Sequence, residues 1–269
     1  MMNSVRCVLR VLSPVHIGCD EVYEPMAFTL DEEAHKLIAF DPFEFFERLK
    51  NQEKDSFTAI CGKGTIASIL EIYQFMRSKK ASGHEVGVSS EMVQHYRRTL
   101  SLSPRDSRRL EQELNRFSIS RTSYSSVSQK PYVPGSAVKG ALRTAYLNSR
   151  VKDEALPQGH RATGAKDLEK RLLDGGSFET DPFRLLKVSD FMPLENVKTR
   201  IGYAVNRKKK PSRFEARGPY QILEIIEPHS LFEGWISVVK PESAAHIARP
   251  LAFESILANS AAFYSEEWK

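Results

Sequence analysis

The chain has 269 residues, of which 41% are hydrophobic and 27% charged, and its formal net charge is +5. These values resemble those of ordinary globular proteins and exclude collagen-like, coiled-coil and wholly disordered chains. At about 100–200 residues per domain, the length allows one elaborated domain or two small ones. No apolar run approaches the ~20 residues of a membrane span. Arg6 and Arg10 interrupt the apolar N-terminal stretch, so we expect no signal peptide.

The cysteines and the charge pattern narrow the class further. Cys7, Cys19 and Cys61 are odd in number and lack CxxC spacing, which argues against a disulfide framework or a Cys-rich zinc site and fits a cytoplasmic protein. Residues 1–60 carry six Lys/Arg and eleven Asp/Glu, whereas residues 195–217 carry eight Lys/Arg and two Glu. The asymmetry predicts an acidic face and a polyanion-binding face, although a basic patch alone is more often a solvated face.

The first half of the chain predicts both strands and helices. Taken in order, we expect a strand at 5–12, a hairpin from 26–30 and 36–40, a helix that Asp41 caps and Pro42 begins, a helix at 65–80, a polar loop at 79–90, a charged surface helix at 104–117 and a mobile Ser-rich loop at 118–130.

The segment 132–146 carries the clearest local signal. Pro134 and Gly135 predict a turn, and Ser136 is a good N-cap for an amphipathic helix. Lys139 and Arg143 stand four residues apart, away from the apolar stripe. A helix N-terminus favours anions, so these features predict a phosphate site; the alternative is an ordinary capped helix with two solvated bases. Gly140 is a poor helix former, which suggests a backbone or ligand close by.

The remaining elements complete an α+β pattern. We expect a polar insertion at 150–182 with a helix at 165–173, extended segments at 183–191 and 194–205, a hairpin from 220–227 and 231–239, and a helical tail. This order fits an RRM-like or ferredoxin-like sheet with large helical insertions. The expected division is an RRM-like core at 1–60 plus 131–240, an inserted helical region at 61–130 and a C-terminal helical segment at 241–269.

Further candidate RNA contacts lie in turns and in the basic segment. His16 follows the first strand and is suited to stack on a base or act as a general base, with a structural turn histidine as the alternative. Tyr203 and Phe214 interleave with the cations and are equally suited to base stacking or to the core. The predicted phosphate-contacting cations outside 132–146 are Arg121, Arg200, Arg207, Lys208, Lys209, Lys210 and Arg213.

A catalytic metal is the less favoured hypothesis. Asp20 and Glu21 follow His16, and such acids can bind a metal for a metal-dependent endoribonuclease. No HxxxH, HD or DxD pattern joins them, so we predict no metal, no other cofactor and no catalytic residue. A protein-interaction scaffold without RNA affinity is the third hypothesis.

Four segments taken together resemble the RAMP superfamily of CRISPR RNA-binding proteins. The second of them is the most specific, and the order of the others adds weight. They are Leu12–Gly18, Pro131–Tyr146, Asp181–Asp190 and Leu223–Gly234. The resemblance spans most of residues 5–240 and is strongest to the subunits that cap the crRNA 3′ side in type III-A (Csm) effector complexes.

The resemblance implies an RRM-like core that holds crRNA through its backbone at the end of a filament of related subunits. The implied partners are crRNA, target RNA indirectly, the repeated backbone RAMP subunit with other Csm subunits, and host nucleases recruited for crRNA 3′-end maturation. Residues 19–25 lack the longer Asp-bearing loop of the backbone RNase subunit, so no catalytic role is carried over to Asp20. The chain stops at Lys269 without the Gly-rich loop that many RAMP proteins carry, which leaves a compact member and a truncated second half both open.

Overall fold

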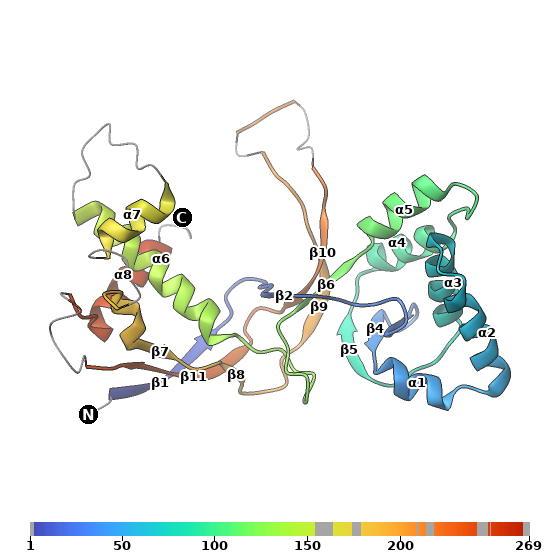
Figure 1. Cartoon of the computed structure of the whole chain (residues 1–269), viewed down its shortest axis with the longest axis horizontal. Coiled ribbons are helices and arrows are strands. Elements are labelled where there is room, and N and C mark those ends of the chain that lie inside the picture. Colours follow the sequence, from blue (N-terminus) through green and yellow to red (C-terminus); the bar gives the residue numbers. More distant parts are fainter. Residues whose placement is uncertain are drawn as a thin grey trace. The chain divides into compact units, whose positions relative to one another are not determined.

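The computed structural model describes residues 3–153, 164–173, 179–208, 210–213, 218–240, 247 and 249–265. It forms two compact units, whose elements are shown in Figure 1. Unit 1 comprises Met1–Leu9, Tyr132–Leu194 and Leu231–Lys269, and unit 2 comprises Arg10–Pro131 and Glu195–Ser230. Both this division and the predicted one have a boundary near residue 131. The other predicted boundaries stay a prediction.

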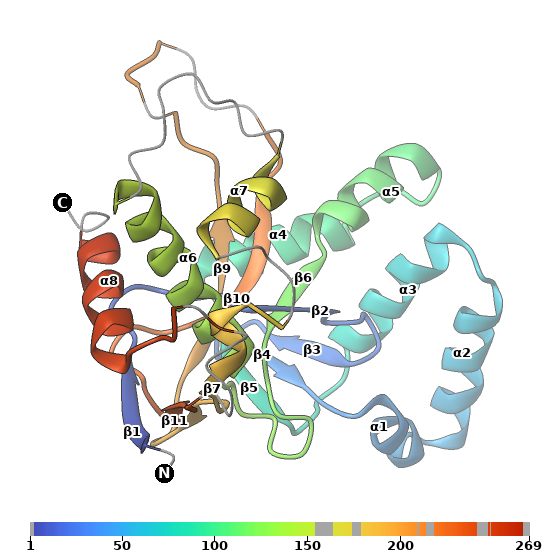
Figure 2. The ribbon, with the colours of Figure 1, turned by 60° about the vertical axis from the view of Figure 1, so that its left-hand side comes forward.

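Unit 1 is a small sheet with helices on one face (Figures 1 and 2). Strand β11 lies between β1 and β7 and also pairs with β8. Gly234 of β11 packs directly against the ring of Phe191. A Cβ at this position would lie 2.7 Å from the ring, so only glycine fits. The elements are β1 (Asn3–Arg10), α6 (Gly135–Asp153), α7 (Ala165–Leu172), a 3-10 helix at Pro182–Leu185, β7 (Leu186–Val188), β8 (Met192–Pro193), β11 (Leu231–Val238) and α8 (Phe253–Ser265).

Unit 2 is built on a seven-stranded sheet in the order β2-β6-β10-β9-β5-β4-β3. Strand β10 pairs antiparallel with β9, from Gln221 opposite Ala204 to Ile226 opposite Thr199, and parallel with β6. The strands are β2 (Gly18–Val22), β3 (Phe28–Asp31), β4 (Lys36–Ala39), β5 (His84–Gly87), β6 (Ile119–Thr122), β9 (Thr199–Ala204) and β10 (Gln221–Ile226). The helices are α1 (Pro42–Arg48), α2 (Asn51–Gly62), α3 (Ile66–Arg77), α4 (Ser90–Leu100) and α5 (Ser107–Arg116).

The hydrophobic core of unit 2 joins its strands to helices α3, α4 and α5. Phe117 is fully buried and packs against the rings of Tyr73 and Tyr96, with centroids 5.9 Å apart in both pairs. Phe28 of β3 makes an edge contact with Tyr73. Such aromatic contacts bury large apolar areas, so the helices and the sheet form one packed body. No helix in the described ranges has the length and apolar character needed to cross a bilayer.

The α+β prediction is confirmed, but several local predictions are wrong. The expected loop at 79–90 contains β5, and the expected mobile loop at 118–130 contains β6. Both strands pair in the seven-stranded sheet, so the predicted helical region at 61–130 is not purely helical. The expected hairpin from 220–227 and 231–239 does not form, because β10 and β11 belong to different sheets. Ranges 154–163, 241–246 and 266–269 of the expected insertion and tail lie outside the described residues.

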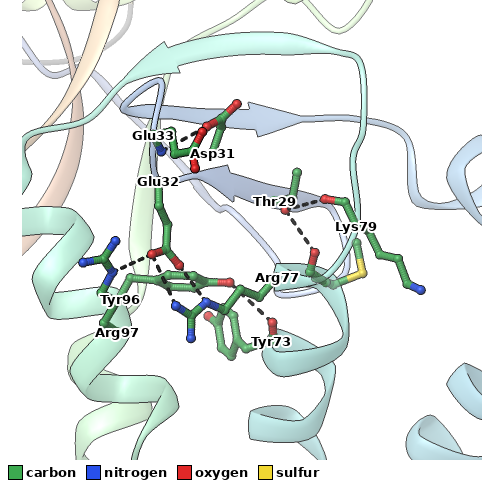
Figure 3. A network of polar contacts seen from close by, with 10 residues as sticks. Thr29, Asp31, Glu32, Glu33, Tyr73, Arg77, Lys79, Tyr96 and Arg97 are labelled. Carbon is green, nitrogen blue, oxygen red and sulfur yellow. Dashed lines mark hydrogen bonds and ion pairs between the residues drawn. The ribbon is translucent and has the colours of Figure 1, made fainter.

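A paired carboxylate fastens the turn between β3 and β4 to two helices (Figure 3). Glu32 in this turn accepts hydrogen bonds from Arg77 Nε of α3 at 2.7 Å and from Arg97 Nε of α4 at 2.5 Å. Burial raises the pKa of the Glu32 carboxyl, but the two guanidinium groups outweigh it and hold the pKa below its usual value. The ionised carboxylate is therefore the stable form at neutral pH.

A second carboxylate, Glu224 of β10, lies inside the sheet with 2% exposure. Its Oε2 accepts the Thr122 N–H of β6 at 3.2 Å, and His84 Nε2 of β5 lies 3.9 Å from its Oε1. Burial raises the pKa of Glu224, but these neighbouring donors outweigh burial, so the pKa lies below its ordinary value of 4.5. A charged group here is tolerated because neighbours from β5 and β6 stabilise it.

We predict that Glu224→Gln lowers the free energy of unfolding at pH 7 by about 1–3 kcal/mol, since a charge-assisted contact is lost in a buried position. The folded-state pKa is depressed, so the stabilisation is complete above about pH 4.5 and is lost as the pH falls through that pKa. Urea unfolding at pH 7 and pH 3.5 measures both effects. The exposed Glu85→Gln serves as the control, and an equal loss in both variants would contradict the prediction.

Candidate nucleic-acid interface

The N-terminus of α6 differs from the predicted phosphate site. The Gly135 N–H donates to Asp190 Oδ1 at 2.8 Å, and the amides of Ala137 and Val138 donate to the Pro134 carbonyl. A Cβ at Gly135 would lie 2.5 Å from the Val188 carbonyl oxygen, so glycine is required by close backbone packing. The chain's own carboxylate therefore occupies the position expected for a phosphate. Ser136 remains exposed beside it.

No neighbouring backbone approaches Gly140, and a ligand close to it stays a prediction. A Cβ at this position would meet nothing within 4 Å, and the residue is exposed. The glycine that a neighbouring backbone requires is Gly135, five residues earlier in the chain.

Lys139 and Arg143 bind protein groups within unit 1. Lys139 Nζ donates to the Leu186 carbonyl at 2.9 Å, and burial lowers the pKa of its ammonium group. Arg143 Nη1 contacts Asp181 at 2.8 Å, and its Nη2 contacts Glu169 at 2.6 Å. These contacts fasten α6 to β7, α7 and the 3-10 helix. The sequence correctly placed the two cations on a common side, but their partners lie 26–47 residues away and were not predicted.

We predict that Arg143→Ala lowers the free energy of unfolding by about 1–3 kcal/mol, because two half-buried carboxylates lose their cation. A double-mutant cycle with Asp181→Asn, followed by urea unfolding, measures the coupling. Arg48→Ala removes an exposed helix pair and should change stability by about 0.5 kcal/mol or less. An Arg143→Ala protein that kept its stability but lost one unit of salt dependence in RNA binding would restore the phosphate-contact role.

His16 and Arg121 are also held by internal contacts. His16 Nδ1 lies 2.8 Å from the Glu224 carbonyl oxygen, a contact that agrees with the turn histidine of the alternative hypothesis. The Arg121 guanidinium stacks on Tyr124, 3.4 Å from the ring centroid, and its Nη2 donates to Gln129 at 3.2 Å. Both residues are partly buried, and Arg121 Nε has no hydrogen-bond partner among the described residues, so the RNA contacts expected of His16 and Arg121 stay predictions.

The cations between β9 and β10 have a different environment. Arg207, Lys210 and Arg213 are exposed, and no ion pair to them is found in the described ranges. Lys208 Nζ donates to Ser212 Oγ at 3.0 Å, and Arg200 Nε lies 4.0 Å from Glu227. Lys209 and Phe214 lie outside the described residues. This segment, 207–213, is the part of the predicted interface that keeps cations open to solvent.

Tyr203 belongs to the core side of β9. Its hydroxyl lies 2.9 Å from His95 Nδ1, and its ring packs against the hydrophobic core of unit 2. Burial raises the pKa of Tyr203 to about 12. The core alternative for this residue therefore agrees with the structure.

The acids of the ribonuclease hypothesis have separate roles. Glu21 accepts a hydrogen bond from the Tyr124 hydroxyl at 2.6 Å, and Asp20 has a positive φ of 59° in the bulged strand β2. Within the residues that the structure describes, no group of three or more His, Cys, Asp or Glu side chains is placed to hold a metal ion.

The fold and the family can now be compared with known proteins. A model of the RAMP superfamily matches residues 8–253, which is most of the chain. The chain therefore belongs to the RAMP superfamily, as the four sequence segments indicated.

Among curated proteins, the chain is similar to the CRISPR system Cms protein Csm5 of Methanocaldococcus jannaschii, with 26% identity over 205 residues. The match covers 71% of this chain and 43% of that relative, so the chain spans less than half of the relative's length. The chain is thus a RAMP protein with similarity to Csm5.

Two solved structures share its fold. One is a chain of a Csm–crRNA–target RNA ternary complex of a type III-A CRISPR–Cas system, with a TM-score of 0.55 and 20% identity over 98% of this chain and 75% of that chain. The other is the crystal structure of T. onnurineus Csm5, with a TM-score of 0.51 and 19% identity over 86% of this chain and 67% of that one. These likenesses confirm the RAMP-type α+β fold.

Proposed function

We propose that this protein is a non-catalytic crRNA-binding subunit of a type III-A Csm complex, positioned on the crRNA 3′ side. Membership of the RAMP superfamily supports the proposal, as does the similarity to Csm5 and to a chain of a Csm–crRNA–target RNA complex. In this role it would support crRNA 3′-end maturation and antiviral defence in the cytoplasm.

The observation that carries the RNA-binding part is the solvent exposure of the described cations in segment 207–213. Arg207, Lys210 and Arg213 are exposed there, whereas Arg143 has a pair of carboxylate partners. An arginine that already pairs with carboxylates must lose those contacts before it can bind phosphate, while a solvated cation loses only water and counterions. Phosphate contacts of this kind hold RNA without reading its sequence.

The proposal also assigns partners. The repeated backbone RAMP subunit would adjoin this protein, target RNA would be reached through the crRNA, and host nucleases would be recruited for 3′-end trimming. The excess of acidic residues in segment 1–60 would repel RNA and would suit a basic protein neighbour.

We predict that the triple variant Arg207→Ala, Lys210→Ala and Arg213→Ala binds a crRNA-like single-stranded RNA more weakly. Three lost phosphate contacts should reduce the slope of log affinity against log salt by about 2 units. Filter binding across a salt series measures the slope.

The matched control removes three cations that already have carboxylate partners, Lys36, Arg48 and Lys63. Its net charge falls equally, so any general electrostatic effect appears in both variants. Equal slopes for the two triple variants would overturn the assignment of segment 207–213 as the RNA contact.

We further predict that purified protein does not cleave labelled RNA, with or without Mg²⁺. His16 and Glu21 have protein partners and assemble no described metal site, so a metal-dependent step lacks its ligands. Gel analysis of RNA incubated with Mg²⁺ or with EDTA tests this. Cleavage that requires Mg²⁺ and disappears in Asp20→Asn would favour the ribonuclease hypothesis, and absence of RNA affinity in every assay would favour a protein scaffold.

A further inference from the structure

A groove of about 690 Å³ lies between α4 and α5 in unit 2, outside segment 207–213. Its walls come from the end of α4, the connecting loop and α5, and Tyr220 lines one side just before β10. Figures 1 and 2 show α4 and α5 as neighbours in both views. The volume is in the range of about 300–1,000 Å³ that is typical of small-ligand sites.

The walls of this α4–α5 groove carry an excess of arginine. Arg98 and Arg109 are exposed and form no ion pair in the described part of the chain. The two carboxylates of the groove are already engaged: Asp106 Oδ1 accepts the Arg109 backbone N–H as the N-cap of α5, and Glu113 pairs with Arg116 at 3.0 Å. Two guanidinium groups are therefore available to an anion that enters the groove.

The floor of the groove is aromatic and uncharged. His95 is 8% exposed, and its two ring nitrogens lie 2.9 Å from the Tyr203 hydroxyl and 3.3 Å from the Tyr220 hydroxyl. Burial, with the nearby Arg98 charge, lowers the pKa of His95, so its imidazole is neutral at physiological pH. The hydrogen bonds fix the half-buried ring of Tyr220 beside the arginines.

We propose that the α4–α5 groove binds a phosphate-bearing nucleotide, with Arg98 and Arg109 on the phosphate and the base against Tyr220. Guanidinium groups present paired donors that match phosphate oxygens, and a tyrosine ring stacks on any base. The nucleotide is either free or one unit of a single-stranded RNA, since both present the same phosphate and base. The inference does not depend on crRNA binding, because none of its residues belongs to segment 207–213.

Equilibrium dialysis of the full chain with AMP, with a pentauridylate RNA and with inorganic phosphate tests the proposal. We expect AMP or the RNA to bind, and Arg98→Ala with Arg109→Ala to weaken that binding about tenfold or more, which corresponds to about 1.4 kcal/mol. The matched control is Arg105→Ala with Arg108→Ala, which removes two exposed cations that do not line the groove. Tighter binding of the RNA than of AMP identifies a strand, and equal affinities identify a free nucleotide.

Substitutions of Tyr220 give a second test, because Tyr220→Phe is conservative and should preserve folding. Tyr220→Phe keeps the ring and should retain the affinity for AMP. Tyr220→Leu should weaken AMP binding and leave the binding of inorganic phosphate unchanged. Thermal melting checks that each variant is folded.

Three outcomes would overturn the proposal. Neither AMP nor the RNA binds; the Arg105→Ala, Arg108→Ala control loses as much affinity as the groove variant; or inorganic phosphate binds as tightly as AMP. The triple variant in segment 207–213 should bind AMP normally, so failure of the crRNA proposal and failure of this one are distinguishable.

Discussion

The buried carboxylate of Glu224 is the constraint on which unit 2 depends. It lies on β10 between β6 and β9, and it engages the Thr122 amide of the adjacent strand β6 and the His84 ring of β5, two strands away. A charged group at 2% exposure would be costly without these partners, so the strands must keep their register around it. Segment 207–213 and Tyr220 both precede β10 in the chain, and β10 begins directly after Tyr220.

In unit 1, carboxylates of the chain bind groups that the sequence analysis predicted would contact RNA. Asp190 accepts the Gly135 amide, and Asp181 with Glu169 holds Arg143. The end of a helix and a nearby cation attract any anion, and a carboxylate tethered by the chain has a much higher local concentration than a dissolved phosphate. Family motifs at such positions are therefore compatible with a purely structural role. Arg207, Lys210 and Arg213 differ from these groups, because no carboxylate pairs with them in the described part of the chain.

The sequence predicted elements whose signals are local. Asp41 and Pro42 begin α1, the apolar periodicity of 65–80 gives α3, and the alternation before Ser13 gives β1. It failed where pairing over long distances decides the structure: β6 is a four-residue strand in a Ser-rich stretch that its neighbours β2 and β10 stabilise. The site followed the same rule. The spacing of Lys139 and Arg143 placed them on a common side of the helix, but no local pattern specifies their partners. Tertiary packing brings Leu186 to Lys139 and Asp181 to Arg143.

Two adjacent arginines of α4 show why the structure is needed to sort cations by role. Arg97 turns toward Glu32, which it shares with Arg77, and this ion-paired cluster joins two helices to a turn (Figure 3). Arg98 is the next residue along the helix, so it lies about 100° further around the helix axis, and it lines the α4–α5 groove. The two residues have the same chemistry and neighbouring positions in sequence. Arg97 stabilises the fold because it pairs with Glu32, whereas Arg98 forms no ion pair in the described part of the chain and keeps its donors for the proposed anion.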